Sequence, residues 1–241
     1  FSCGVSSFVV EWMALKKYNN VELVYCDTGG EHESNKVFLR QSEALLGRKI
    51  TILKNPLYEN HFDVYRKVRF IGNGQKSTCA KRLKKDMRVK YQQPDDIHLM
   101  GYTAEEQIRA ESFDLRNPET TEWLLIDEGI TKDDCLGILW QSGIEMPEMY
   151  KLGYNHNNCI GCCKGGMGYW NKIRQDFPAN YKIMASIERE LNYSMNKYFL
   201  DEMPINAGDF QNEPNVECGI SCYDIFQNLT INDKDLIKKY K

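Results

Sequence analysis

Residues 1–30, FSCGVSSFVVEWMALKKYNNVELVYCDTGG, decide the fold. Apolar side chains recur at three- and four-residue spacing over residues 7–18, which predicts an amphipathic helix. The run VELVYC at residues 21–26 has the length and composition of a buried strand. Small polar residues precede the helix and follow the strand. The stretch therefore predicts a loop, a helix, a strand and a second loop, which is the repeating unit of an α/β protein.

The same alternation continues along the chain. Further strands are predicted at residues 49–53, 96–101 and 122–126, and further helices at residues 35–46, 80–92, 104–113 and 132–141. Such alternation favours a mostly parallel sheet with helices on both faces, and ligands bind at the carboxyl ends of its strands. We expect residues 1–150 to form this α/β domain.

The character of the sequence changes after residue 150. A cluster of cysteines and glycines, NNCIGCCKGGMG at residues 157–168, is followed by predicted helices at 170–176 and 178–191. Residues 201–222 carry turn formers with little periodicity, as in a loop laid over other elements. We therefore expect residues 151–241 to form a cysteine-rich helical appendage and tail.

Composition excludes several classes of protein. The 34 acidic residues slightly outnumber the 31 basic ones, which argues against a surface that tracks nucleic acid throughout. No apolar run approaches the roughly 18 to 20 residues that cross a bilayer, so no membrane partner is expected. The nine cysteines are an odd number in a long chain, which favours reduced thiols and a cytoplasmic location over a disulfide framework.

The loop before the first helix has the composition of an anion site. Its members are Ser2, Cys3, Gly4, Ser6 and Ser7, which offer hydroxyls and backbone amides at a helix N-terminus. The alternative is that these residues only cap the helix. A second small polar loop, residues 26–30, follows the neighbouring strand, and two such loops at one sheet edge favour a nucleotide site.

Several segments carry a resemblance to a known family. FSCGVSS (1–7) resembles the SGGxDS loop of the PP-loop adenine-nucleotide superfamily, and CDTGGEHESNKVFL (26–39) resembles the DTGxxxxE/N stretch of its phosphoadenosine phosphosulfate reductase-like branch. Further matches follow in the branch's order: STCAKRLK (77–84), GYTAEEQIRAE (101–111), WLLIDEGITKDDCLGIL (123–139), NCIGCCKGG (158–166) and ECGIS (217–221). The resemblance spans residues 1–222 and implies a PP-loop, Rossmann-like fold.

The resemblance assigns nucleotide-binding roles. The first loop would hold phosphate or sulfate oxygens, and Asp27, Thr28 and Gly29 would border the adenosine. Arg109 is a candidate anion clamp, since guanidinium groups bind oxyanions through two hydrogen bonds; the alternative is a surface ion pair with Glu105 or Glu106. The loop should also follow a buried strand, so we expect an apolar strand of about five or six residues upstream of Phe1 in the native protein.

The cysteine spacing indicates a metal site. Cys159 and Cys162 form a CxxC pair among glycines, which typically binds zinc or an iron–sulfur cluster, although buried apolar cysteines are the alternative. In the reductase family such a pair holds a four-iron four-sulfur cluster with cysteines before the basic helix. The resemblance implies Cys79, Cys159 and Cys162 as ligands, with Cys163 or Cys222 as the fourth. A rival set for zinc or a cluster is Cys159, Cys162, Cys218 and Cys222.

Cys218 is the candidate nucleophile. Its segment ECGIS resembles the family's ECGIH tail, with Ser221 in place of the histidine, and the family's cysteine attacks the sulfur of a bound sulfonucleotide. The leading hypothesis is therefore an oxidoreductase that converts phosphoadenosine or adenosine phosphosulfate to sulfite, with a thiol reductant such as thioredoxin.

Two alternatives remain open. One is an ATP pyrophosphatase-type enzyme that adenylates a small molecule or a nucleic acid before sulfur insertion. The other is a non-catalytic module that binds a nucleotide or zinc. His32 and His61 are lone loop histidines, for which a ligand role is the alternative, and we expect both to face solvent.

Overall fold

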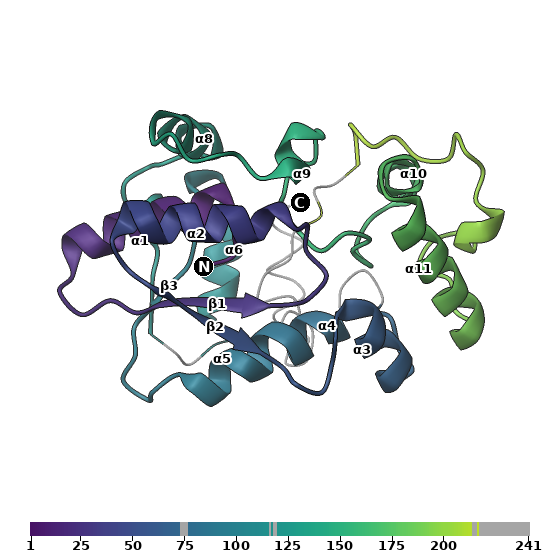
Figure 1. Cartoon of the computed structure of the whole chain (residues 1–241), viewed down its shortest axis with the longest axis horizontal. Coiled ribbons are helices and arrows are strands. Elements are labelled where there is room, and N and C mark those ends of the chain that lie inside the picture. Colours follow the sequence, from purple (N-terminus) through teal and green to yellow (C-terminus); the bar gives the residue numbers. More distant parts are fainter. Residues whose placement is uncertain (73–76, 116, 118–119, 214–215, 217–241) are drawn as a thin grey trace.

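The computed structural model describes residues 1–72, 77–115, 117, 120–213 and 216 of the 241-residue chain. Helices and short parallel strand pairs make a mixed α/β fold (Figure 1). The first elements are α1 (Val5–Lys17), β1 (Leu23–Asp27), α2 (Ser34–Leu46), β2 (Ile50–Lys54), α3 (His61–Val68), α4 (Thr78–Ala80), the π-helix η1 (Lys81–Lys85) and α5 (Asp86–Tyr91). They are followed by β3 (His98–Leu99), the 3-10 helix η2 (Ala104–Glu106), α6 (Gln107–Asp114), β4 (Thr121–Glu122), α7 (Leu124–Asp127), α8 (Lys132–Gln141), α9 (Glu148–Lys151), α10 (Met167–Asp176), α11 (Pro178–Leu191) and the 3-10 helix η3 (Leu200–Glu202).

Strands β1 and β2 confirm the two strands predicted first. They pair in parallel over five residues, from Leu23 opposite Ile50 to Asp27 opposite Lys54. In Figure 1, α1 and α2 lie on one side of this pair and α5 lies on the other, and η1 contacts both β1 and α5. The expected arrangement of a parallel pair between helical layers is therefore present here, and both carboxyl ends point to the same edge.

The second half of the predicted sheet is different. β3 and β4 form a separate parallel pair of two residues each, His98 with Thr121 and Leu99 with Glu122. The prediction of a strand over residues 122–126 is wrong, because residues from Leu124 onward turn into α7. Periodicity does not separate a short buried helix from a buried strand, and Leu124 and Leu125 are both buried. Across the described residues the sheet is thus two separate pairs rather than one.

Most predicted helix ends are confirmed. Thr131 caps α8 in a reciprocal arrangement with Asp134, and Gly47 ends α2 in the left-handed conformation at φ +63°. Pro178 opens α11. The helix predicted over residues 80–92 is instead three consecutive pieces, α4, η1 and α5, with a π-helical turn in the middle.

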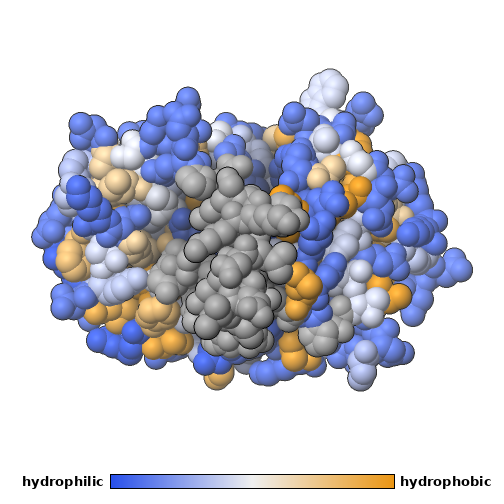
Figure 2. Space-filling view, turned by 180° about the vertical axis from the view of Figure 1, so that it is seen from behind, coloured by the Kyte–Doolittle hydropathy of each residue, from blue (hydrophilic) through white to orange (hydrophobic). Residues whose placement is uncertain are grey.

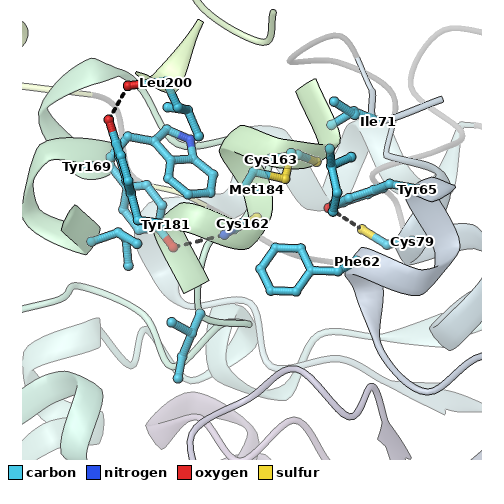
Figure 3. Close-up of a cluster of buried hydrophobic side chains, with 14 of the residues drawn as sticks. Phe62, Tyr65, Ile71, Cys79, Cys162, Cys163, Tyr169, Tyr181, Met184 and Leu200 are labelled. Carbon is cyan, nitrogen blue, oxygen red and sulfur yellow. Dashed lines mark hydrogen bonds between the residues drawn. The ribbon is translucent and has the colours of Figure 1, made fainter. Parts of the chain in front are cut away.

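Two hydrophobic cores lie in the molecule. The sheet core gathers aliphatic and aromatic side chains from α1, β1, α2, β2, α7 and α8, and its buried members include Val5, Phe8, Val9, Leu23, Phe38, Ile50, Leu125 and Leu139. The cysteine core gathers side chains from α3, α4, η1, α10 and α11, and its buried members include Phe62, Tyr65, Ile71, Cys79, Leu83, Cys162, Cys163, Tyr169, Trp170, Ile173, Met184 and Ile187 (Figure 3). The cysteine core takes residues from both sides of position 150.

The outer surface is mostly hydrophilic on the face that Figure 2 shows, with apolar residues scattered over it. Among the residues described, no helix has the length and apolar content needed to cross a membrane.

Candidate functional site

A cleft of about 640 Å³ lies between β1 and β3, and α1 and α5 contribute further walls. This volume is within the range of roughly 300 to 1,000 Å³ that small-molecule sites occupy. The structure brings five of the sequence-predicted residues together on its lining: Ser2, Gly4, Ser6, Ser7 and Arg109.

The first turn of α1 opens onto this cleft. Gly4 is the N-cap residue, none of the serines caps the helix amides, and Val5 N donates to Tyr150 OH at 3.4 Å. The serines bond to one another instead: Ser2 donates through both its backbone N and its Oγ to Ser7 Oγ, each at 3.1 Å, and Ser7 Oγ donates to Gly4 O at 2.8 Å. The positive end of the α1 dipole therefore faces the cleft, as an anion site requires.

Two cations lie beside this turn. Lys132 Nζ donates to Ser6 Oγ at 3.4 Å, and Arg109 stacks on the Tyr102 ring at 4.2 Å while it pairs with Glu106. Arg109 therefore forms the ion pair of the second interpretation, and it also lies on the cleft lining, where the first interpretation requires it. Lys132 was not predicted. Its position is the available signal, because a lysine in the first turn of α8 opposes the helix dipole and a bound anion would offset that cost.

His156 also lines the cleft and was missed by the sequence analysis. Its Nε2 is buried, and no described group hydrogen-bonds to it. Burial, with the charge of Lys132 as a smaller cause, lowers the pKa of this imidazole to about 4. The ring is neutral at pH 7 and offers one nitrogen to a ligand. The signal in the sequence was its place three residues before the CxxC pair.

Cys3 does not face the cleft as predicted. The residue is fully buried in the sheet core, and its Sγ donates to Asn35 O at 3.8 Å. Its backbone is left-handed at φ +54°, and its carbonyl accepts a hydrogen bond from Asn157 Nδ2 at 2.6 Å. Burial raises the pKa of the Cys3 thiol well above its usual range.

The loop after β1 turns toward the cysteines. Gly29 N donates to Asp27 Oδ1 at 2.8 Å, and Asp27 also pairs with Lys54 at 3.6 Å. Thr28 is 2% exposed, and its Oγ1 lies 3.1 Å from Cys159 Sγ. The predicted residues Asp27, Thr28 and Gly29 therefore do not line the cleft, whereas Cys26 does.

Glu31 connects the cleft to the cysteines and was not singled out in the sequence. Its buried carboxylate accepts from Tyr25 OH at 2.7 Å, from Asn35 Nδ2 at 2.9 Å and from Thr28 Oγ1 at 3.3 Å. It also pairs at 3.7 Å with Lys84, which lines the cleft. A continuous chain of polar contacts therefore runs from Lys84 through Glu31 and Thr28 to Cys159.

Three of the four cysteines predicted for metal binding lie in or beside the cysteine core. The Cys163 side chain forms hydrogen bonds with those of Cys79 and Cys162. Tyr65 OH lies 3.3 Å from Cys79 Sγ (Figure 3). The bond with Cys162 and burial raise the pKa of Cys163 to about 12, whereas burial is the main cause that raises the pKa of Cys159 to about 12. The Cys159 and Cys163 thiols are therefore protonated at pH 7 when no metal is bound.

The buried rings of Tyr169 and Trp170 fix the conformation of the CxxC turn. Gly161 adopts φ +78°, and a side chain there would meet the Trp170 ring at 3.0 Å, so glycine is required at this position. Tyr169 OH accepts hydrogen bonds from Gly161 N at 3.1 Å and from Cys162 N at 3.0 Å.

Thiolates are ligands that zinc and iron–sulfur clusters prefer, and Cys163 contacts Cys79 and Cys162, whereas Cys159 contacts Thr28. Within residues 1–72, 77–115, 117, 120–213 and 216, no three histidine, cysteine or acidic side chains have the geometry that holds a metal ion. Cys218 and Cys222, the predicted nucleophile and the other candidate ligand, lie outside the described residues.

His61 corrects an expectation. The ring is 1% exposed rather than facing solvent, because it stacks on Phe62 at 3.9 Å beneath the loop that contains Gly30. Burial lowers its pKa to about 4.

No family model, curated protein or solved structure matches this chain.

Proposed function

We propose that this chain binds an adenine sulfonucleotide in the cleft and reduces it with cysteine thiols, as the resemblance to the PP-loop reductases implies. One observation carries the proposal. The α1 turn, Lys132 and Arg109 line one cleft, and Lys84 of the same cleft connects through Glu31 to the cysteine group.

The cleft residues have complementary roles toward such a ligand. The α1 dipole and Lys132 attract phosphate or sulfate oxygens, and Arg109 offers a planar donor next to Tyr102. Neutral His156 hydrogen-bonds without adding charge.

The chemistry is assigned to Cys218, on the resemblance alone. Its thiolate attacks the sulfonate sulfur, the bond from sulfur to the bridging phosphate oxygen breaks, and the nucleoside phosphate leaves with the electron pair. A thiol of thioredoxin type then attacks Cys218 Sγ, releases sulfite and forms a disulfide, so two thiols supply the two electrons.

The metal centre belongs to the same proposal. On the resemblance and on the thiol donor set, a four-iron four-sulfur cluster, or zinc in the alternative, would be held by Cys79, Cys159, Cys162 and Cys163. These thiols would have to lose their protons and move closer together than the described geometry places them. A bound centre would keep these four sulfurs deprotonated and hold them in fixed positions.

The binding step is tested with Lys132→Met, because this change removes the charge and keeps a similar length. Adenosine phosphosulfate should bind at least about 10-fold more weakly, as expected for one lost charge-assisted contact. Lys151→Met is the matched control, since Lys151 pairs with Glu145 on the surface. Equal binding by both variants would contradict the assignment of the site.

The reaction is tested with anaerobically purified protein, thioredoxin and each nucleotide in turn. Sulfite should form from a sulfonucleotide and should be lost in Cys218→Ser, while nucleotide binding persists. Pyrophosphate release from ATP without sulfite would favour the adenylating alternative. Full sulfite production by Cys218→Ser rejects the mechanism.

A further inference from the structure

One tyrosine hydroxyl on the cleft lining lies at the first turn of α1. Tyr150 belongs to α9, and its OH accepts a hydrogen bond from Val5 N at 3.4 Å. The backbone amide of Asn157 hydrogen-bonds to the same oxygen. Tyr150 therefore connects the segment that leads to the CxxC pair with the serine turn, which comprises Ser2, Gly4, Ser6 and Ser7.

The position of Tyr150 is fixed by the residues that precede it in α9. Glu148 N donates to Ser34 Oγ at 3.0 Å, which attaches α9 to the start of α2. Met149 is buried in the cysteine core, whereas the Tyr150 ring packs against the sheet core. The hydroxyl is thus held in place before any ligand binds, which lowers the cost of ordering a ligand contact there.

The hydrogen of this hydroxyl is available to a ligand. A phenol oxygen accepts at most two hydrogen bonds, and the amides of Val5 and Asn157 supply both. The hydrogen must therefore point away from these amides, and within the described part of the chain no group accepts it. Burial raises the pKa of Tyr150 to about 12, so the phenol keeps its proton at pH 7.

The space next to this hydroxyl has the surroundings of an oxyanion site. A Cβ on Gly4 would lie 3.4 Å from Ser2 Oγ and 3.5 Å from Tyr150 OH, so both hydroxyls border one space. Lys132 Nζ lies 5.6 Å from the centroid of the Tyr150 ring and donates to Ser6 Oγ. Hydroxyl donors and a positive charge therefore meet beside the positive end of the α1 dipole.

We propose that Tyr150 determines ligand specificity in this cleft, because its hydroxyl donates a hydrogen bond to a phosphate or sulfate oxygen next to Ser2 and Gly4. The identity of the ligand as an adenine sulfonucleotide rests on the proposed function, whereas the donor role of Tyr150 does not. Since its oxygen already accepts from two amides, this hydroxyl cannot accept a hydrogen from a ligand. The cleft thus selects a ligand with an acceptor oxygen at this point over one that presents an N–H or O–H donor.

Tyr150→Phe removes the donor and keeps the ring. Adenosine 5′-phosphosulfate and inorganic pyrophosphate are the two probes, and calorimetric titration measures their affinities. Each should bind at least about 10-fold more weakly, as expected for one lost hydrogen bond to a charged group. Tyr154→Phe is the matched control, because the Tyr154 hydroxyl lies off the cleft lining and donates to Asp176 Oδ2 at 2.9 Å. It should leave both affinities unchanged.

A second variant separates donation to a ligand from support of the turn. With 3-fluorotyrosine at position 150, the phenol becomes a stronger donor and a weaker acceptor, and it stays protonated at pH 7 because the pKa of Tyr150 starts at about 12. The proposal expects tighter binding of a probe. A hydroxyl that only supports the amides of Val5 and Asn157 would instead give weaker binding and a lower Tm.

Equal affinities in the unsubstituted protein and Tyr150→Phe would overturn the proposal, and so would weaker binding by the fluorotyrosine variant. If pyrophosphate binds and responds as expected while adenosine 5′-phosphosulfate does not bind, the proposed function fails and the donor role stands. If neither probe binds to the unsubstituted protein, the donor role is rejected together with the anion site.

Discussion

The sheet core and the cysteine core are built in different ways. The sheet core draws mainly on residues 5–50, which follow one another along the chain, and closes against α7 and α8. The cysteine core joins residues 62–83 to residues 149–203, and it combines large aromatic, aliphatic and methionine side chains with small thiols. Local pattern explains the first core. The second depends on contacts between distant segments, and the candidate chemistry lies where the two meet.

The largest expected effect comes from breaking the cysteine core alone. Trp170 is fully buried, so Trp170→Ala should lower the free energy of unfolding by about 3 to 5 kcal/mol. Denaturant titration measures this loss, and Trp140→Ala is the control because that ring is 80% exposed. If the cores unfold as one unit, the transition stays single. A second transition appearing in the variant would show that they unfold separately.

The next largest effect is a pH dependence of the free energy of unfolding. It comes from His61, which lies at the edge of the cysteine core. Burial lowers its folded pKa to about 4, so the unfolded chain binds the proton first as the pH falls below about 6.5. The neutral His61 ring contributes its full share to the free energy of unfolding above pH 6.5, and about 3 kcal/mol of that free energy is lost as the pH falls toward 4. His61→Gln should flatten this part of the stability profile, whereas His32→Gln should leave it. An unchanged slope in His61→Gln would contradict the burial argument.

The two cores also explain how much the sequence could predict. The strands at 21–26 and 49–53, the helix ends at Gly47, Thr131 and Pro178, and the serine turn on the cleft all depend on local signals. The run at 122–126 was misassigned because a short apolar run fits a helix as well as a strand. The pair of Glu31 with Lys84, the lowered pKa of His156 beside Lys132 and the burial of His61 under the loop of Gly30 each depend on residues more than 20 positions away, and no local pattern encodes such contacts.

A smaller effect is expected where the cores meet. Asn157 Nδ2 donates to Cys3 O at 2.6 Å and to Asn35 Oδ1 at 2.7 Å, and the residue is buried. Asn157→Ala leaves both acceptors without this donor and should cost about 2 kcal/mol. Thermal unfolding measures the loss. Asn155→Ala is the control, because that side chain is exposed; an equal loss there would remove the assigned role.

The smallest effect concerns a single hydroxyl. Tyr65→Phe removes the group that lies 3.3 Å from Cys79 Sγ and keeps the ring in the cysteine core. The expected loss is about 1 kcal/mol, as for one buried hydrogen bond. Tyr58→Phe, at a half-buried ring beside the same core, is the comparison. A gain in stability for Tyr65→Phe would show that the hydroxyl is not satisfied by the thiol.

The π-helical turn η1 sets the relation between Cys79 and the residues that follow it. On its carboxyl side, Lys84 reaches Glu31, while Cys79 on its amino side contacts Cys163. An α-helix advances by about 100° per residue, so a deletion of one residue within the turn would rotate Cys79 relative to Lys84 by roughly that angle. The wider π-helical turn therefore sets the angle at which Cys79 faces the thiols while Lys84, on the same short helical segment, faces the cleft.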